Sequence, residues 1–478
     1  MSSAWASNLI GIGLPKDPRE FKGLKVGVIG LGETGCTLSE KLLNWGAEVI
    51  AIDSKPIWAL KACKKIKELT VRGLTAIGGT DEAEELFGCQ LVVLSPSVRP
   101  DKPFIERLRS RGIKVTGEIE LAYAMCKGRI IAITGTNGKT TTATLVHHML
   151  ETSGVKAFLV GNIGTPAISC VDIADETSWL VMEVSSFQLM TCEAFRPNIG
   201  IITNIAADHL DWHRDIEEYI SAKAKLLRMQ HEDDFAVLNS DDDGVRKVMH
   251  VGAAKRVLFG LGNNTANVRL VGKKIVADIP EVGIDGATLC TLEDMQVCGE
   301  HNILNVMAAS AAALLSGVSP DSIRGAIASF AGVPHRLEVV GEIDGVKFIN
   351  DSAATSPHAA LQALRSIDAP IIWVAGGENK GLDFGILSDA VKRRVKTAVL
   401  IGSAAMEIAE FLMRLNVPFK LAGGLEEAVS LAFNMASRGD VVLLSPACRS
   451  LDMFENYAER GEQFRVAVKR LSGVIKND

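Results

Sequence analysis

Short apolar runs bounded by glycine, proline or polar clusters recur along the chain, with amphipathic stretches between them. Such runs are typical of buried strands in parallel sheets. They predict strands at 25–29, 48–52, 91–94, 130–133, 179–184, 200–204, 235–239, 268–276, 346–349, 371–375, 398–401 and 441–444. The helical pattern covers 36–44, 143–150, 219–227 and 299–315. Strands that alternate with helices indicate an α/β protein with mostly parallel sheets.

The run from Ile130 to Thr142 joins an apolar strand to a helix through a glycine-containing turn. Such a turn places backbone N–H groups and a helix N-terminus against anionic oxygens. Lys139 can reach nucleotide phosphates, and Thr140 can place its hydroxyl on Mg²⁺. The spacing departs from the strict Walker motif, which needs glycine where Ile133 stands. We interpret the run as a variant phosphate loop; the alternative is an ordinary strand–helix turn with a chance lysine.

A second glycine turn, Gly30 to Gly35, follows the first predicted strand and precedes a helix. The next strand ends at Asp53, which completes a βαβ unit with a dinucleotide-type turn. Taken alone, this unit would suggest NAD binding. A lone glycine motif is weak evidence, and the phosphate loop downstream offers another nucleotide site.

Glu183 lies at the end of a predicted buried strand, where an acid is costly unless it is paired or bound to a metal. We favour a Mg²⁺ ligand because a phosphate loop needs an acidic metal partner; the alternative is a carboxylate that emerges into solvent. His209 and His213 are spaced like a zinc pair, but no glutamate stands between them as in H-E-x-x-H. We interpret His213 as structural.

Two lysines, Lys223 and Lys225, lie on the predicted helix at 219–227. Their spacing places them about 200° apart around the helix, so they should face different surroundings. The simplest interpretation of either is a solvated surface charge. Arg336 could likewise form a surface ion pair with Glu338. Cys448 lacks an identifiable activating base, so we expect a small buried residue rather than a nucleophile.

The amino-acid composition argues against several classes of partner and location. Hydrophobic residues make up 47% and charged residues 23%, and the net charge of −6 gives no global basic field for nucleic acid. No apolar run is long enough to span a membrane, and the N-terminus does not resemble a secretory signal. Nine cysteines without a C-x-x-C pair fit reduced cytoplasmic thiols better than a disulfide frame. We expect a cytoplasmic protein, a monomer, with no nucleic-acid or membrane partner.

The chain of 478 residues is too long for one hydrophobic core, and its length suggests about three domains. We expect a Rossmann-like domain at 1–123, a central ATPase-type domain with a mostly parallel sheet at 124–333, and a second Rossmann-like domain at 334–478. Glycine and proline punctuate the second boundary, around Gly332 and Pro334.

Several motifs in order resemble the Mur ligase superfamily, ATP-dependent amide-forming enzymes, from Lys25 to about Phe464. They include Thr-Gly-Thr-Asn-Gly-Lys-Thr-Thr in the phosphate loop and N-[IV]-x-x-D-H-L-D from Asn204. The segment Tyr219–Lys223 matches Y-x-x-A-K, and F-x-G-x-x-H-R-x-E begins at Phe330. The glycine turn and the tail Leu-Ser-Pro-Ala-Cys-Arg-Ser-Leu-Asp-Met-Phe most resemble members that add D-glutamate to UDP-N-acetylmuramoyl-L-alanine.

The resemblance implies a role for each matching residue. The catalytic residues would be Lys139, Glu183, His209 and Lys223. The Mg²⁺ ligands would be Thr140, Glu183, His209 and Lys223, the last carbamylated by CO₂. ATP would contact Gly135, Thr136, Asn137, Gly138, Lys139, Thr140, Thr141, Asn302, Asn305, Arg336 and Asp351. The UDP substrate would contact Gly30, Gly32, Glu33, Thr34, Asp53, Ser54, Lys55, Ser97 and Asn162. The amino acid would contact Thr355, Lys380, Ser450, Leu451 and Tyr457.

The implied reaction forms an acyl phosphate from ATP and the substrate carboxylate, which the amine of D-glutamate then attacks, in peptidoglycan precursor synthesis. Two positions depart from the family: Ser97 stands where glycine is usual, and Ala353 where many members have lysine. Lys380 is then the leading cation for the amino acid. The alternative within the superfamily is a paralogue that adds a different amino acid. A folate-type ligase would not need residues 25–123, an oxidoreductase leaves the phosphate loop unexplained, and a non-catalytic nucleotide-binding module leaves Glu183, His209 and Lys223 unexplained as a set.

Overall fold

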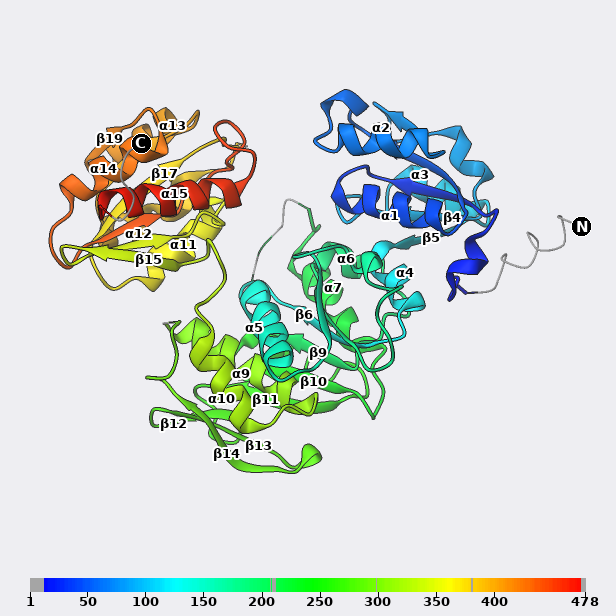
Figure 1. Ribbon diagram of the computed structural model, residues 1–478, viewed down its shortest axis with the longest axis horizontal. Coiled ribbons are helices and arrows are strands. Elements are labelled where there is room, and N and C mark those ends of the chain that lie inside the picture. The colour runs from blue at the N-terminus through cyan, green and yellow to red at the C-terminus, as the bar shows by residue number, and fades with distance from the viewer. Residues whose placement is uncertain (1–12, 207, 209–211, 298, 380, 474–478) are drawn as a thin grey trace, which may run out of the picture. The chain divides into compact units, whose positions relative to one another are not determined.

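The computed structural model describes residues 13–473 except 207, 209–211, 298 and 380. The chain divides into two compact units, residues 1–330 and 331–478. The first unit contains two sheets and the second contains one, and Figure 1 shows helices flanking each sheet. The predicted α/β class with mostly parallel sheets is confirmed.

The first sheet has five parallel strands in the order β3-β2-β1-β4-β5, a Rossmann-like arrangement. The strands are β1 (Lys25–Ile29), β2 (Glu48–Asp53), β3 (Thr75–Gly78), β4 (Leu91–Leu94) and β5 (Lys114–Gly117). The helices are α1 (Glu33–Asn44), α2 (Cys63–Val71), α3 (Pro103–Ser110) and α4 (Glu118–Met125). The sequence pattern missed β3 because this strand is short and none of its side chains is fully buried.

The central sheet has nine strands in the order β14-β13-β12-β11-β10-β9-β6-β8-β7. They are β6 (Arg129–Thr134), β7 (Ala157–Gly161), β8 (Trp179–Glu183), β9 (Ile199–Ile202), β10 (Phe235–Asn239), β11 (Lys255–Gly260), β12 (Val268–Val271), β13 (Lys274–Ile279) and β14 (Ile284–Thr291). The helices are α5 (Lys139–Thr152), α6 (Ser186–Met190), α7 (Ile216–Arg228), α8 (Asp243–Arg246), α9 (Glu300–Leu315) and α10 (Pro320–Ser329). Strands β12, β13 and β14 pair antiparallel at one edge, and the others pair parallel.

The single strand predicted at 268–276 is wrong. The segment is a hairpin of β12 and β13 with a tight turn at Gly272–Lys273, where Gly272 has a φ of +61°. Glycine adopts this left-handed conformation without steric cost, so the chain reverses there. Apolar residues on both sides of the turn made the two strands resemble one run.

The third sheet has the order β15-β16-β20-β17-β18-β19, and only β15 and β16 pair antiparallel. Its strands are β15 (Glu338–Ile343), β16 (Val346–Asn350), β17 (Ile371–Gly376), β18 (Val395–Ile401), β19 (Phe419–Leu421) and β20 (Val441–Leu444). The helices are α11 (Pro357–Ser366), α12 (Ser388–Arg394), α13 (Ala405–Arg414), α14 (Leu425–Met435) and α15 (Tyr457–Leu471). The pattern missed the edge strands β15 and β19, which are half-exposed.

Short 3₁₀ helices lie at Pro18–Phe21, Ile57–Ala59, Glu84–Gly88, Ala167–Ser169, Pro280–Val282 and Phe384–Leu387. Among the described residues, no helix has the length and apolar character needed to span a membrane.

Candidate active site

The predicted phosphate loop connects β6 to α5 and is held in a tight conformation. Gly138 has a φ of +80°, and a Cβ there would lie 2.3 Å from Oδ1 of Asn305. A Cβ on Gly135 would lie 1.9 Å from Oγ1 of Thr203. Only glycine therefore fits at either position, because the loop backbone runs directly against neighbouring side chains.

Two residues that follow β9 fix the loop, and the sequence analysis gave neither a role. Asn204 accepts a hydrogen bond from the Asn137 N–H (2.8 Å) and donates to its carbonyl (3.0 Å). Thr203 donates to the same carbonyl at 2.6 Å. The N-[IV]-x-x-D-H-L-D motif, which begins at Asn204, carried the signal for this contact. These bonds pre-form the loop, so its N–H groups need little rearrangement to meet an anion.

Lys139, the first residue of α5, folds back over the loop. Its ammonium donates to the carbonyls of Gly135 (3.0 Å) and Thr136 (2.8 Å). Asn302 and Asn305, predicted one turn apart, lie on α9 and hydrogen-bond to each other at 3.3 Å. Asn305 also contacts the start of α5, because Thr142 donates to its Oδ1 at 3.3 Å.

Glu183, at the carboxyl end of β8, is 2% exposed, so the alternative of a solvent-facing carboxylate is wrong. Oε2 accepts a hydrogen bond from the Thr140 hydroxyl (2.7 Å), and Oε1 accepts one from the Asn162 amide (2.8 Å). The hydroxyl and carboxylate oxygens are the donor set that Mg²⁺ prefers. Among the described residues no three His, Cys, Asp or Glu side chains form a metal cluster. His209 lies outside the described residues.

Lys223 on α7 is 1% exposed, so the solvated-surface interpretation is wrong for this residue. Its Nζ donates to the Gly135 carbonyl at 2.7 Å, the same carbonyl that Lys139 contacts. Burial, and then the nearby Lys139 charge, lower the pKa of the Lys223 amine well below its ordinary value. Lys225 faces elsewhere, as predicted: it donates to the carbonyls of Met190 (2.7 Å) and Cys192 (3.3 Å).

The glycine turn of the first sheet is held by Asp53. This carboxylate accepts hydrogen bonds from the N–H groups of Leu31 (2.8 Å) and Lys55 (2.9 Å). Ser95 donates to the Gly30 carbonyl at 2.9 Å. The other residues predicted for the UDP substrate and described on this sheet lie at the carboxyl ends of β1, β2 and β4, namely Gly32, Glu33, Thr34, Ser54, Lys55 and Ser97. Asn162 is the exception, since it lies on the central sheet and bonds Glu183.

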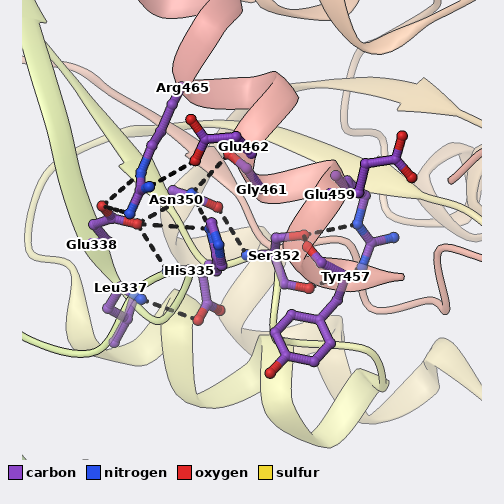
Figure 2. Close-up of polar contacts among 12 residues, drawn as sticks. His335, Leu337, Glu338, Asn350, Ser352, Tyr457, Glu459, Gly461, Glu462 and Arg465 are labelled. Atoms are coloured by element: carbon purple, nitrogen blue, oxygen red, sulfur yellow. Dashed lines mark hydrogen bonds and ion pairs between the residues drawn. The ribbon is translucent and has the colours of Figure 1, made fainter. Parts of the chain in front are cut away.

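In the second unit, a polar cluster holds the backbone around Arg336 (Figure 2). His335 and Leu337 have φ values of +62° and +46°, which are unusual for residues other than glycine. The Asn350 amide donates to Nδ1 of His335 at 3.0 Å, and the His335 N–H donates to Glu338 at 2.8 Å. Arg336 itself is exposed. Glu338 is paired with Arg465 on α15, so the suggested Arg336–Glu338 pair is wrong.

Asp351 follows β16 and is buried. It accepts hydrogen bonds from the Ser445 hydroxyl (2.8 Å) and the Leu337 N–H (3.2 Å). Burial raises the pKa of this carboxyl to about 7, against the opposing effect of the Ser445 hydrogen bond. Asp351 is therefore partly protonated near neutral pH, unlike an ordinary aspartate.

Of the described residues predicted for the amino acid, Thr355, Ser450 and Leu451 lie on the segments that follow β16 and β20, and Tyr457 begins α15. Thr355 is half-buried, Ser450 is buried, and Leu451 and Tyr457 are exposed. Lys380 lies outside the described residues. Arg460, which received no role, is fully buried and donates to the carbonyls of Ser352 (2.9 Å) and Cys448 (3.2 Å), so it joins both loops. Cys448 is 1% exposed, which confirms the expected buried cysteine, and burial raises the pKa of its thiol to about 12.

Comparison with known proteins identifies the family. Residues 24–117 match the Mur ligase MurD-like N-terminal domain, residues 133–313 the Mur ligase middle domain, and residues 335–448 the Mur ligase glutamate ligase domain. The UDP-N-acetylmuramoylalanine–D-glutamate ligase of Caldanaerobacter subterraneus subsp. tengcongensis is 40% identical over 456 residues, covering 95% of this chain and 99% of the relative. This chain belongs to the Mur ligase family.

Further Mur ligases agree with this assignment. The ligase of the same name from Koribacter versatilis is 38% identical over 454 residues, covering 95% of this chain and 99% of the relative. Among solved structures, the UDP-N-acetylmuramate–alanine ligase MurC of Thermotoga maritima has a TM-score of 0.58 at 19% identity, covering 95% of this chain and all of that one. The MurF ligase of the same organism, solved with ADP, has a TM-score of 0.54 at 16% identity, covering 97% and 99%. At these identities the two structures establish the Mur ligase fold alone.

Proposed function

We propose that this Mur ligase joins D-glutamate to UDP-N-acetylmuramoyl-L-alanine at the expense of ATP, in cytoplasmic peptidoglycan precursor synthesis. Two relatives at 38–40% identity carry the name of that reaction. The observation that carries the proposal is the convergence of two amines on one loop carbonyl. Lys139 and Lys223 both donate to Gly135, beside the Thr140–Glu183 pair. A plain strand–helix turn has no reason to bury a second lysine against its backbone.

The chemistry follows from the weakness of a carboxylate as an electrophile. Transfer of the γ-phosphoryl group to the substrate carboxylate forms an acyl phosphate and ADP. The amine of D-glutamate attacks the acyl carbon, and the tetrahedral intermediate releases phosphate, with loss of a proton from nitrogen. Lys139 and the loop N–H groups stabilise the charge on the phosphoryl oxygens during transfer.

The oxygen donors at the loop fit a bound Mg²⁺ ion. Thr140 and Glu183 would hold it, and His209 and Lys223 complete the set that we propose. When bound, the ion neutralises charge on the phosphate oxygens. Burial and the nearby Lys139 charge lower the pKa of Lys223 and so favour its neutral amine, which would add to CO₂ and release a proton. The resulting carbamate would be a further anionic oxygen donor.

The remaining roles are assigned by sheet. We place the UDP substrate at the carboxyl edge of the first sheet, in domain 1–123, and ATP at the phosphate loop, in domain 124–333. We place D-glutamate on the loops after β16, β17 and β20, in domain 334–478. Ala353 removes a family lysine from this region, so Lys380 is the proposed partner of the glutamate side chain. The same departure is the observation that favours a paralogue with another amino-acid specificity.

Phosphate release tests both candidates. The purified protein should release phosphate only when ATP, Mg²⁺, UDP-N-acetylmuramoyl-L-alanine and an amino acid are all present. Across a panel of D- and L-amino acids, D-glutamate should give the highest kcat/KM. A preference for another amino acid would transfer the assignment to the paralogue. Absence of any ATP-dependent product with all partners present would refute the ligase itself.

A further inference from the structure

Arg99 links two parts of the first unit that carry different proposed ligands. It follows β4 and lies two residues beyond Ser97, on the side proposed for the UDP substrate. Its guanidinium pairs with Asp101 through two hydrogen bonds, of 2.9 and 2.8 Å. It also donates from Nη1 to the backbone carbonyl of Trp212 and lies 4.8 Å from the centre of that indole ring. The side chain is 26% exposed, so most of its surface is covered by these contacts.

Trp212 belongs to an aromatic cluster that consists of Phe187, Trp212, His213 and Tyr219. The ring of Trp212 lies 4.3 Å from Phe187 and 4.9 Å from His213. The His213 ring lies 5.2 Å from the Tyr219 ring. Aromatic rings at such distances attract one another, so the four side chains form one continuous path of contacts.

The far side of the aromatic cluster contacts the proposed phosphate site directly. The Tyr219 hydroxyl hydrogen-bonds to Oγ1 of Thr136 in the loop at 3.0 Å. The Tyr219 ring lies 4.5 Å from the Lys223 amine. His213 hydrogen-bonds through Nε2 to the Ser186 hydroxyl at 2.9 Å, three residues beyond Glu183. The cluster therefore touches the loop, the buried amine and the segment after the acid.

We propose that Arg99 is a positioning residue that couples the edge of the first sheet to the phosphate site through Trp212 and the aromatic cluster. A ligand beside Ser97 would then favour the loop arrangement that binds the nucleotide. Only a planar guanidinium can pair with Asp101, donate to a carbonyl and stack on an indole together, so lysine should not replace it. This inference rests on the proposed function, because it needs two ligands to couple.

The test measures binding of a non-hydrolysable ATP analogue with and without UDP-N-acetylmuramoyl-L-alanine. We expect the UDP substrate to tighten analogue binding to the wild-type protein at least fivefold, the lower end of typical coupling. In Arg99→Met and Arg99→Lys this ratio should fall to near one, with intrinsic analogue affinity within about twofold of wild type. Trp212→Leu should have the same effect, and the double variant should be no worse than either single one, because both remove the same link.

Arg107→Met is the matched control. Arg107 also lies over an aromatic ring, Phe104 at 5.4 Å, and pairs with Glu82, but all three residues lie on the first-sheet side. Its coupling ratio should equal that of wild type. An unchanged ratio in the Arg99 variants, or an equal loss in Arg107→Met, would overturn the proposal. Arg99→Lys retains the charge and most of the stem if Arg99→Met folds poorly. Failure of wild type to bind the UDP substrate would count against the proposed function instead.

Discussion

Two charged lysine ammonium groups that donate to one carbonyl repel each other electrostatically. At 4 Å, two unit charges repel by about 4 kcal/mol at an effective dielectric constant of 20. Lys139 and Lys223 both donate to the Gly135 carbonyl, and only Lys223 is almost completely buried. Burial and repulsion act in the same direction on its pKa. Both effects favour the neutral form of Lys223, the amine that we propose for reaction with CO₂, and Lys139 is the proposed phosphate-binding charge.

Replacing Lys139 tests the proposed nucleotide site. Lys139→Ala should lower kcat for ATP-dependent phosphate release by roughly 10²–10³-fold, the usual cost of losing one preorganised charge stabiliser. Its melting temperature should stay close to that of wild type. Lys225→Met, which changes a lysine of α7 that contacts the carbonyls of Met190 and Cys192 instead, is the control and should retain turnover. Near-normal turnover in Lys139→Ala would remove the loop from the mechanism.

Replacing Lys223 tests the proposed carbamate. Lys223→Ala should be nearly inactive, because no anionic oxygen donor would replace the proposed carbamate. Short-chain carboxylates such as acetate or propionate should restore part of the activity, since they place an anionic oxygen in the space left by the side chain. Lys139→Ala under the same conditions is the control, and carboxylates should not restore its activity, because an anion cannot replace the positive charge proposed for Lys139. Full activity without added carboxylate would contradict the modification.

Residues that end a strand were predictable from the sequence, while those that support them were not. The carboxyl ends of neighbouring parallel strands meet at one sheet edge, which brings Glu183 of β8 to the loop that follows β6. The contact of Asn305 with Gly138, and that of Thr203 with Asn137, join positions separated by 60 residues or more. No periodicity reports such pairs, because they depend on how helices and loops pack over the sheet.

At the scale of elements, the β1–α1 turn separates structural from ligand-facing glycines. Gly30 has a φ of +98°, and a Cβ there would lie 2.8 Å from the Ser95 side chain. Gly32 has a φ of −72°, and nothing lies within 4 Å of its Cβ position. The motif presents both as equivalent, yet the first is required by the fold. The second leaves open space at the N-terminus of α1, where an anion is stabilised.

These two glycines give a paired prediction. Gly32→Ala should leave the melting temperature near that of wild type and raise KM for UDP-N-acetylmuramoyl-L-alanine about tenfold, because the methyl group blocks close approach to the backbone. KM for ATP should change little. Gly30→Ala should lower stability by at least 1–2 kcal/mol from backbone strain alone, roughly as for any left-handed non-glycine residue. Thermal melts and steady-state kinetics on both variants check this. An unchanged KM in Gly32→Ala would place the UDP substrate elsewhere.

At the scale of the whole first unit, α4 joins the first sheet to the central sheet through two buried carboxylates. Glu120 accepts hydrogen bonds from the N–H groups of Glu193, Ala194 and Phe195 at 2.7–3.2 Å. Glu118 accepts one from Ile168 at 2.7 Å, while its Oε2 atom is buried without a hydrogen-bond partner among the described residues. The ion pairs Lys41–Asp172 and Lys114–Glu193 also cross this junction, but partly exposed pairs contribute little. The stability of this junction therefore depends on the protonation and hydrogen bonding of the two buried carboxylates, Glu118 and Glu120.

The contribution of Glu118 to the free energy of unfolding should change with pH. Burial raises the pKa of its carboxyl from 4.5 to about 7. A carboxyl with a raised pKa in the folded state contributes stability that is fully present below its unfolded pKa and is lost as the pH rises through 7.

Glu118→Gln imitates the protonated acid, so its free energy of unfolding should increasingly exceed that of wild type between pH 4.5 and 7. The gap should be at most about 3.5 kcal/mol and constant above that range, since one pKa unit corresponds to about 1.4 kcal/mol. Urea denaturation at several pH values measures it, with Glu176→Gln, an exposed acid, as the control for net charge. A gap that does not grow with pH would mean that Glu118 is charged in the folded protein, with a partner for its second oxygen.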